Sequence, residues 1–433
     1  MLIKNGAEKL RQFSNTQHKF QIFSPNPNLI HVVGLGHSNA GAIAGSRSVI
    51  LIDTLDSITR AEKLKQIIEE KFHKPVETII YTHGHPDHRG GAGVFKDTVK
   101  EIIAFKAQKP VLKYYDHLQH ASYKRADYQF GYHLNDAELI SMGIGKREKG
   151  TAIGEGDTEF LAPTTVYDTN GTVERTIDGV HLKLVSAVGE SDDEIFIWDS
   201  RDQAMFCGDS YYACWPNLYA LRGTQYRDVA SWIDSLDMIR QYPAEYLLPG
   251  HTQVIQGARE IATVLKNYRD AIAWVLSETL HCIDMGLSIS QTVEKVQLPE
   301  KLRELPYLGE YYGTVAWSVR SIFNGYVGWF DGNATNLNCL PESIFNQKLL
   351  DLISRDKLEK AIQTEFSQQH FQMAAELCDV ILKTDEKNEL ALRWKAKAFK
   401  ELADEETSAS GRHYYLNCAK ELEGNIEKGL QAN

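Results

Sequence analysis

The sequence predicts a layered α/β domain followed by an all-α domain. Short apolar runs alternate with an amphipathic helix pattern in the first two-thirds of the chain, strand signals stop after about residue 256, and paired helical segments follow. With 433 residues, of which 43% are apolar, the chain is long enough for two or more domains with real cores. This composition excludes disordered, collagen-like and disulfide-scaffold proteins.

In the first two-thirds of the chain, predicted strands alternate with predicted helices. This order is typical of a domain with buried strands and helices outside the sheets. Apolar strands are predicted at residues 31–36, 48–53, 76–82, 181–188, 194–200, 204–209 and 245–250. An amphipathic helix is predicted at residues 61–72. Residues 105–170 form a long inserted loop region rich in Tyr, His and Gly, and loops of that length usually carry function.

The C-terminal part of the sequence has helical periodicity. A long helix is predicted over residues 258–286, and further helices at residues 357–369, 371–385, 388–404 and 411–430. Their spacing is typical of paired antiparallel helices in helical-repeat modules. We expect domains at residues 1–285 and 286–433, the second serving packing and oligomerisation rather than a second active site.

Charge and targeting signals narrow the class of partner. The net charge is −11 and no basic run offers a surface for nucleic acid, so we expect no nucleic-acid partner. The six cysteines are scattered without a close pair, which indicates reduced thiols rather than a disulfide framework. The first twenty residues lack the apolar run of a secretory signal, and no segment reaches 18 apolar residues. We therefore expect a cytoplasmic protein without a membrane span.

The strongest chemical signal directly follows the strand at residues 76–82. His83, His85, Asp87 and His88 stand within six positions. Imidazole and carboxylate suit zinc or a similar ion, and a turn can aim several side chains at one point. A histidine-rich surface turn is the alternative, but the position at a strand's end favours a metal site.

The string His-Gly-His-Pro-Asp-His resembles the HxHxDH signature of the metallo-β-lactamase superfamily, whose fold is an αββα sandwich with a two-metal site at one sheet edge. By this resemblance, His83 and His85 bind the first metal, while Asp87 and His88 bind the second. The resemblance implies two Zn2+ ions, with Mn2+ or Fe as alternatives that accept the same donors.

The remaining ligands are implied by resemblance at later strand ends. Asp209 would bridge both metals, and His251 would bind the second. Glu190 would complete the ligand set of the first metal, because its segment resembles the Glu-bearing turn of the alkylsulfatase branch. That branch commonly has Gly-Thr-Glu where this chain has Val188-Gly189-Glu190, and Glu-Asn where it has Asp209-Ser210.

Further strings resemble the same branch from about residue 30 to residue 425: Asn-Leu-Tyr-Ala-Leu-Arg-Gly at 217–223, Gly-Ile-Gly-Lys at 143–146 and Gly-Trp-Phe-Asp-Gly-Asn at 328–333. The resemblance implies a metal-dependent hydrolase that releases inorganic sulfate from alkyl or aryl sulfate esters. It implies a catalytic domain at residues 1–285 and a homodimer formed through residues 286–433. The sterol-carrier-like domain that often follows in this branch is expected to be lacking.

The resemblance also assigns roles around the substrate. Asp87, Asp209 and Arg222 are the implied catalytic residues, and Arg222 would bind sulfate with Asn217 beside it. A tyrosine hydroxyl could add to the anion pocket, and the choice between Tyr128 and Tyr132 stays open.

Other assignments stay open at the level of sequence. His133 and His181 are candidates for the general acid by residue type alone, and attack at sulfur or at carbon is not distinguished. Asp53 is expected to hydrogen-bond a ligand imidazole or to cap a turn. The rival functions are another hydrolase of the superfamily, acting on a thioester, a phosphoester or a β-lactam, and a non-catalytic binding protein that retains metals.

Overall fold

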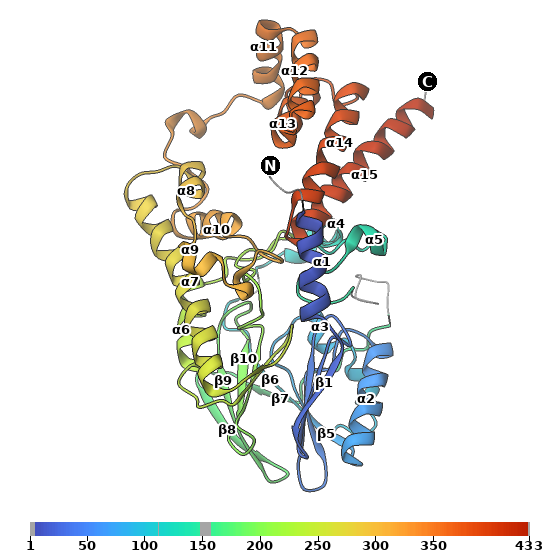
Figure 1. Ribbon diagram of the computed structural model, residues 1–433, viewed down its shortest axis with the longest axis vertical. Helices are drawn as coiled ribbons and strands as arrows, with labels where there is room; N and C mark the ends of the chain where they lie inside the picture. The colour runs from blue at the N-terminus through green and yellow to red at the C-terminus, as the bar shows by residue number, and fades with distance from the viewer. Residues whose placement is uncertain (1–4, 111, 148–156, 432–433) are drawn as a thin grey trace. The chain divides into compact units, whose positions relative to one another are not determined.

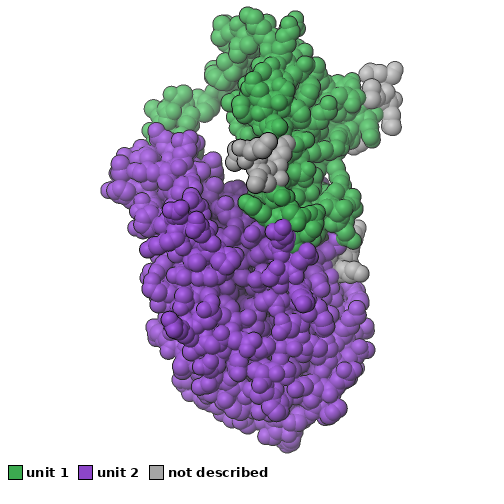
Figure 2. All heavy atoms as spheres, viewed as in Figure 1, with its two compact units in different colours: residues 1–11, 124–140, 329–433 green, residues 12–123, 141–328 purple. Residues whose placement is uncertain are grey.

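The computed structural model describes residues 5–110, 112–147 and 157–431 (Figure 1). Contacts divide the chain into two compact units (Figure 2). Residues 12–123 and 141–328 form one, here called the sheet unit. Residues 1–11, 124–140 and 329–433 form the other, the helical unit. The domain boundary that we predict after residue 285 stays a prediction.

Within the described residues, the strands of the sheet unit form two sheets. The first has the order β1-β2-β3-β4-β5-β6-β7, and the second has the order β13-β12-β11-β10-β9-β8. Strands β4 to β7 run parallel, as do β11 and β12, while the other neighbours pair antiparallel. The strand bounds are β1 (Gln21–Asn26), β2 (Leu29–Val33), β3 (Ala40–Ala44), β4 (Val49–Ile52), β5 (Val76–Ile80), β6 (Glu101–Phe105), β7 (Thr165–Tyr167), β8 (Thr172–Ile177), β9 (Val180–Ser186), β10 (Ile195–Asp199), β11 (Ala204–Gly208), β12 (Tyr246–Pro249) and β13 (Ile255–Gln256).

Helices cover the outer faces of the two sheets. Helix α2 (Ile58–Phe72) lies on the first sheet, and α6 (Val229–Ile239), α7 (Ala258–Asp284) and α10 (Val315–Val327) lie outside the second (Figure 1). This arrangement confirms the predicted αββα sandwich. Shorter helices of the sheet unit are α3 (Pro86–Arg89), α8 (Ile289–Lys295), α9 (Glu300–Arg303), η1 (Ala92–Phe95), η2 (Tyr115–Leu118) and η3 (Pro306–Leu308).

Three apolar layers hold the sandwich together. Ile50 and Ile80 of the first sheet pack against Phe206 of the second in the central layer. Leu64 of α2 belongs to one outer layer, and Trp232 of α6 belongs to the other. Burial of such side chains from both faces explains why the strands read as continuous apolar runs.

In the C-terminal part of the helical unit, successive helices pack against their neighbours. They are α11 (Glu342–Ile353), α12 (Arg355–Ser367), α13 (Phe371–Leu382), α14 (Glu389–Glu405) and α15 (Ala409–Gln431), preceded by the short helix η4 (Ala334–Leu337). This confirms the predicted all-α C-terminal region. Helix α1 (Gly6–Gln17) begins in this unit and ends in the sheet unit.

Besides η2, the described part of the inserted region at residues 105–170 contains the helices α4 (Gln119–Phe130) and α5 (Asp136–Leu139). His413 of α15 bonds to the carbonyls of Gln129 and Leu139 at 2.8 and 3.0 Å. Residues 111 and 148–156 of the predicted insert lie outside the described residues. In the described part of the chain, no helix combines the length and apolar character needed to cross a membrane.

Candidate metal centre

Strand ends from both sheets bring histidines and acids together at one edge of the sandwich. The segment after β5 carries His83 and His85, and Asp87 and His88 lie on α3. Asp209 follows β11 and His251 follows β12. Parallel strands end at the same sheet edge, which explains why residues so distant in sequence meet here.

Three groups among the described residues could each hold a metal ion through atoms that lie within 4.8 Å of one another. They are His83-His85-Asp209, His88-Asp209-His251 and His37-Asp87-His251. Asp209 belongs to the first two groups, and its predicted role as a bridge between two metals stays a prediction. Of the predicted ligands, only Glu190 is outside these groups.

The distances around His88 and His251 match a coordination sphere that includes Asp87 of the third group as well as Asp209 of the second. Asp87 Oδ2 lies 3.4 Å from both His88 Nε2 and His251 Nε2. Asp209 places Oδ1 3.4 Å from His88 Nε2 and Oδ2 3.4 Å from His251 Nε2. Ligand atoms about 2.0–2.1 Å from a tetrahedral zinc ion are roughly 3.3–3.4 Å apart. These donors therefore fit a metal ion.

Buried atoms without hydrogen-bond partners support the same conclusion. Within the described residues, His88 Nε2, His251 Nε2 and Asp209 Oδ1 are buried and lack a hydrogen-bond partner. Interior polar atoms are ordinarily paired, because an unpaired one costs free energy. A cation between these atoms would satisfy all three.

The Nδ1 atoms of His88 and His251 make the hydrogen bonds that are usual for metal-binding imidazoles. His88 Nδ1 lies 2.8 Å from Asp53 Oδ2, which confirms the hydrogen bond predicted for Asp53. His251 Nδ1 donates to the carbonyl of His37 at 3.0 Å. Such bonds fix the tautomer and leave Nε2 with a lone pair for the metal.

The first group is less evenly spaced. His83 Nε2 lies 2.9 Å from His85 Nδ1 and 3.7 Å from Asp209 Oδ2.

Thr82 donates to both carboxylate oxygens of Asp53, from its backbone nitrogen and its hydroxyl, each at 2.8 Å. Asp53 therefore ties the end of β5 to His88 and aligns the two groups.

Charges within the cluster set the protonation states. Burial alone would raise the pKa of Asp209, but the neighbouring imidazoles of His251 and His88 lower it well below its ordinary value. Burial and the charges of His83 and Arg222 lower the pKa of His85 well below its ordinary value. Burial lowers the pKa of His88, but the carboxylates of Asp87 and Asp209 raise it well above its ordinary value, so this imidazole has to give up a proton when a metal binds.

The structure places Glu190 in a buried ion pair. Its Oε1 lies 2.9 Å from Arg227 Nη1, and its Oε2 accepts a hydrogen bond from the Tyr212 hydroxyl at 3.0 Å. Its role as the third ligand of the first metal stays a prediction.

Glu194 is a buried acid that sequence reasoning missed. One of its oxygens accepts from the backbone nitrogen of Asp209 at 2.6 Å and the other from that of Glu190 at 3.1 Å. A Cβ at Gly208 would lie 3.1 Å from Glu194 Oε1, so glycine leaves room for this contact. Glu194 thus links the two acidic turns, and nothing in the acidic run around it signals that role.

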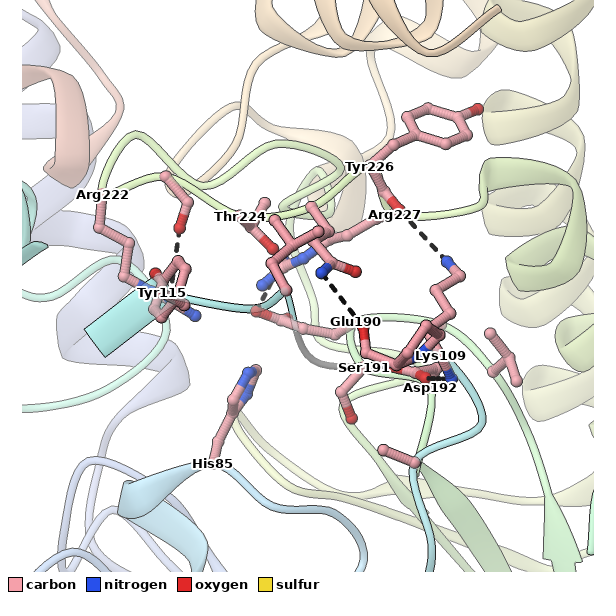
Figure 3. Close-up of a pocket in the computed structure, with 17 residues that line it drawn as sticks. His85, Lys109, Tyr115, Glu190, Ser191, Asp192, Arg222, Thr224, Tyr226 and Arg227 are labelled. Carbon is pink, nitrogen blue, oxygen red and sulfur yellow. Dashed lines mark hydrogen bonds and ion pairs between the residues drawn. The ribbon is translucent and has the colours of Figure 1, made fainter. Parts of the chain in front are cut away.

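A cavity of about 270 Å³ opens beside His85 (Figure 3). The cations Lys109, Arg222 and Arg227 line it, and the ring of Tyr115 lies next to the side chain of Arg222 (Figure 3). The acids Glu190 and Asp192 line it as well, so the cavity combines an aromatic wall with three cations and two carboxylates close to His85.

Arg222 is the predicted substrate residue that lines this cavity. Asn217 is buried; its backbone nitrogen donates to the Tyr212 hydroxyl at 2.8 Å, and its carbonyl accepts from Arg227. The proposed role of its side-chain amide stays a prediction.

The other candidates belong to the helical unit or to β9. Tyr128 belongs to the helical unit, where its hydroxyl donates to Glu421, and Tyr132 stacks on Phe130 with ring centroids 5.8 Å apart. Their proposed substrate contacts stay predictions. His181 is exposed on β9 beside Glu174, while His133 belongs to the helical unit, so the general acid stays unassigned.

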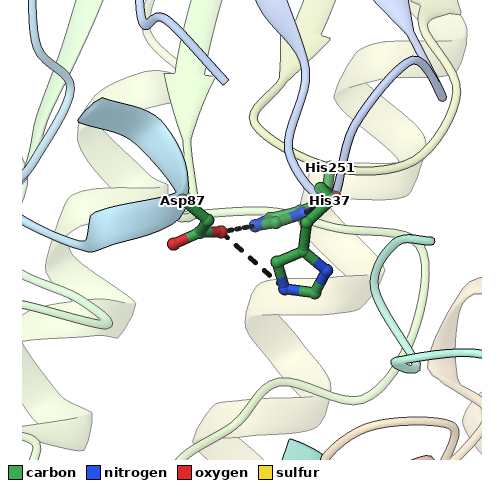
Figure 4. A group of neighbouring side chains, drawn as sticks. All are labelled: His37, Asp87 and His251. Carbon is green, nitrogen blue, oxygen red and sulfur yellow. Dashed lines mark hydrogen bonds and ion pairs between the residues drawn. The ribbon is translucent and has the colours of Figure 1, made fainter. Parts of the chain in front are cut away.

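His37 is the second residue that sequence reasoning missed. It lies between β2 and β3, and its Nε2 is 3.8 Å from Asp87 Oδ2 (Figure 4). A single histidine in a turn has no local spacing pattern that would indicate a ligand. Only the fold brings it to Asp87 and His251.

Comparison with known families matches both parts of the chain. Residues 33–251 match the family described as the metallo-beta-lactamase superfamily, and residues 288–425 match alkyl sulfatase dimerisation. The solved structure of a stereoselective inverting sec-alkylsulfatase from Pseudomonas sp. superposes with a TM-score of 0.85 at 24% identity, covering 96% of this chain and 67% of that one.

Curated relatives agree with these matches. A linear primary-alkylsulfatase of a Pseudomonas species is 32% identical over 397 residues, which cover 89% of this chain and 74% of the relative. An alkyl/aryl-sulfatase of Saccharomyces cerevisiae is 29% identical over 425 residues, which cover 94% of this chain and 64% of the relative. The chain therefore belongs to the alkylsulfatase family of the metallo-β-lactamase superfamily.

Proposed function

We propose that this chain hydrolyses alkyl or aryl sulfate esters and releases inorganic sulfate at a binuclear metal centre. The observation that carries the proposal is the buried carboxylate of Asp209, which lies between two imidazole groups beside a cavity lined by Arg222. The relatives described above are alkylsulfatases, and this supports the choice of a sulfate ester over other esters.

The donor set determines which residues would hold the ions. His83, His85 and Asp209 would hold the first, and Asp87, His88, Asp209 and His251 would hold the second. Imidazole with carboxylate favours Zn2+, although Mn2+ or Fe accepts the same donors. When bound, two such ions lower the pKa of water and supply a nucleophile near neutral pH.

The chain's own side chains would orient the ester. The planar guanidinium of Arg222 can donate to two sulfate oxygens at once, a geometry that the ammonium of a lysine does not offer. The buried pair of Arg227 and Glu190 also lines the cavity, and Arg227 is held further by donating to the carbonyl of Asn217. Tyr115 and Leu112 give the ester's organic part an apolar surface.

Elemental analysis combined with sulfate release tests this function. We expect two metal ions per chain, and sulfate release from octyl sulfate or 4-nitrophenyl sulfate that stops after chelation and returns when Zn2+ is added. Bound metal with turnover of a thioester, a phosphoester or a β-lactam alone would assign another hydrolase. Bound metal without turnover of any of these would indicate a binding protein.

We also propose a homodimer formed through the helical unit. Helix α11 presents large apolar side chains to solvent, with Phe345 56% exposed and Leu352 71% exposed. Apolar patches of this kind mark interaction sites, and residues 288–425 match a dimerisation family.

Replacing Phe345 and Leu352 together by aspartate is expected to convert a dimer into a monomer, because two charges would be buried without partners. Size-exclusion chromatography with light scattering measures the mass, which should fall to that of one 48.9 kDa chain. Lys360→Asp, at an exposed position of α12, is the matched control and should remain dimeric. A monomeric wild-type protein would contradict the proposal.

A further inference from the structure

We propose that Glu194 is a positioning residue of the metal centre. Its carboxylate holds the turns of Asp209 and Glu190 in one arrangement, and this arrangement determines how tightly the centre binds its ions. The inference rests on the metal centre of the proposed function. It concerns ion binding alone, so it can be tested without sulfate release.

The side chain of Glu194 joins the two turns through their backbones. Its Oε1 accepts from the backbone nitrogen of Asp209 at 2.6 Å, and its Oε2 accepts from that of Glu190 at 3.1 Å. Glu194 is 0% exposed. A backbone N–H in the interior needs an acceptor, and the carboxylate is the side-chain group that offers two acceptor oxygens at one end. One side chain therefore serves both turns.

The backbone around Glu194 is fixed to a third segment that carries candidate ligands. The next residue, Ile195, donates from its backbone nitrogen to the carbonyl of Thr82 at 2.9 Å, immediately before His83. The carbonyl of Glu194 accepts from the backbone nitrogen of Ala187 at 2.8 Å. The side chain thus extends from a backbone that is already bonded to the segment of the first group.

Two glycines confine the carboxylate of Glu194. Gly208 has φ +52°, and a Cβ there would lie 3.1 Å from Glu194 Oε1. A Cβ at Gly189 would lie 3.2 Å from Glu194 Oε2 and 3.4 Å from the ring of Trp232. Since the backbone approaches both oxygens this closely, the length of one side chain fixes the separation of the two turns.

Helix α6 holds the same turns by neutral hydrogen bonds. Ser235 Oγ donates to the carbonyl of Val188 at 2.8 Å, and Trp232 Nε1 donates to the carbonyl of Ser210 at 3.0 Å. Each of these bonds attaches one turn to the helix, whereas Glu194 bonds to both turns. Ser235 therefore offers a control for contacts that only stabilise the fold.

An acid at this position is electrostatically unfavourable. Burial, together with the charges of Asp209 and Glu190, raises the pKa of Glu194 well above its ordinary value. A residue whose placement costs free energy beside candidate ligands is typical of a functional site. Hydrogen bonds that orient metal ligands are a function of this kind, because they fix where the ligand atoms lie.

Glu194→Gln is the variant that isolates the proposed role. Glutamine keeps the length of the side chain, but its amide nitrogen donates and does not accept, so one of the two backbone nitrogens loses its acceptor. We expect this variant to bind Zn2+ about 10- to 100-fold more weakly, as measured by competition with a chromophoric chelator. Ser235→Ala removes the neutral bond to Val188 and should bind Zn2+ as the wild type does. Wild-type affinity in Glu194→Gln, or an equal loss in Ser235→Ala, would overturn the proposal.

A crystal structure of the zinc-loaded wild-type protein tests the same point even if Glu194→Gln fails to fold. We expect Glu194 to keep its bonds to the backbone nitrogens of Asp209 and Glu190, with neither of its oxygens bound to an ion. A Glu194 oxygen at about 2.0–2.2 Å from zinc, or a carboxylate that has left either nitrogen, would overturn the proposal. Zinc bound by the wild type without sulfate release would reject the proposed function and keep this inference, because the zinc affinities decide it.

Discussion

Asp209→Asn is expected to lower kcat/KM for sulfate release at least about 10³-fold and to reduce the bound metal. The carboxylate of Asp209 presents one oxygen to His88 Nε2 and the other to His251 Nε2, each at 3.4 Å. An asparagine amide replaces one oxygen with an NH2 group that donates and does not bind a cation. Asp209 Oδ2 also lies 3.7 Å from His83 Nε2 of the first group. One ion would therefore lose this ligand, and the other would keep only a neutral amide oxygen in place of a carboxylate.

Elemental analysis of the purified Asp209→Asn protein, alongside its kinetics, checks this expectation. Asp199→Asn is the matched control, because Asp199 is a buried acid on β10 whose carboxylate accepts from the backbone of Arg201 at 3.0 Å. We expect the control to retain both ions. Full metal content in Asp209→Asn would show that this carboxylate does not bridge them.

Arg222→Ala is expected to lower kcat/KM for alkyl sulfates about 10²- to 10³-fold while leaving the bound metal unchanged. Arg222 lines the cavity beside His85, and its charge contributes to lowering the pKa of His85. A guanidinium in that position can stabilise charge on the sulfate oxygens as the ester bond breaks. Loss of activity at full metal content separates this role from that of the ligands.

Two further variants sharpen the result for Arg222. Arg222→Lys keeps the charge without the planar pair of donors, so we expect partial activity. Lys109→Ala removes another cation of the same cavity, one whose ammonium donates to the Tyr226 carbonyl at 3.2 Å, and we expect a smaller effect. Equal kinetics for the Arg222→Ala and wild-type proteins would exclude the anion-binding role.

The strands that could be predicted are those with a continuous apolar pattern, such as β5 and β11. Strand β3 was missed because its sequence, Ala-Gly-Ala-Ile-Ala, has weak strand propensity. A Cβ at Gly41 would lie 2.2 Å from Phe206 Cε1, so this glycine is required by packing between the sheets. Such a requirement depends on tertiary structure and leaves no local pattern.

The candidate site likewise contains residues that the sequence predicts and residues that it does not. His83, His85, Asp87 and His88 could be predicted because one short turn holds them. His37 and Glu194 could not, since each is an isolated residue whose partners lie far away in the sequence. For Glu190, the family resemblance implied a ligand, and nothing in the sequence indicated its ion pair with Arg227, because that contact joins two separate loops.

The segmented construction of the helical unit has a consequence for biosynthesis. Residues 124–140 are made early, yet the imidazole that bonds to the carbonyls of Gln129 and Leu139 is that of His413. A growing chain contains every candidate metal ligand once residue 251 has been synthesised. Residues 124–140 can contact α15 only after α15 has left the ribosome. Contacts between such distant segments form slowly and leave apolar surface exposed meanwhile. A polypeptide released early thus keeps its metal ligands but leaves residues 124–140 without the helix that covers them.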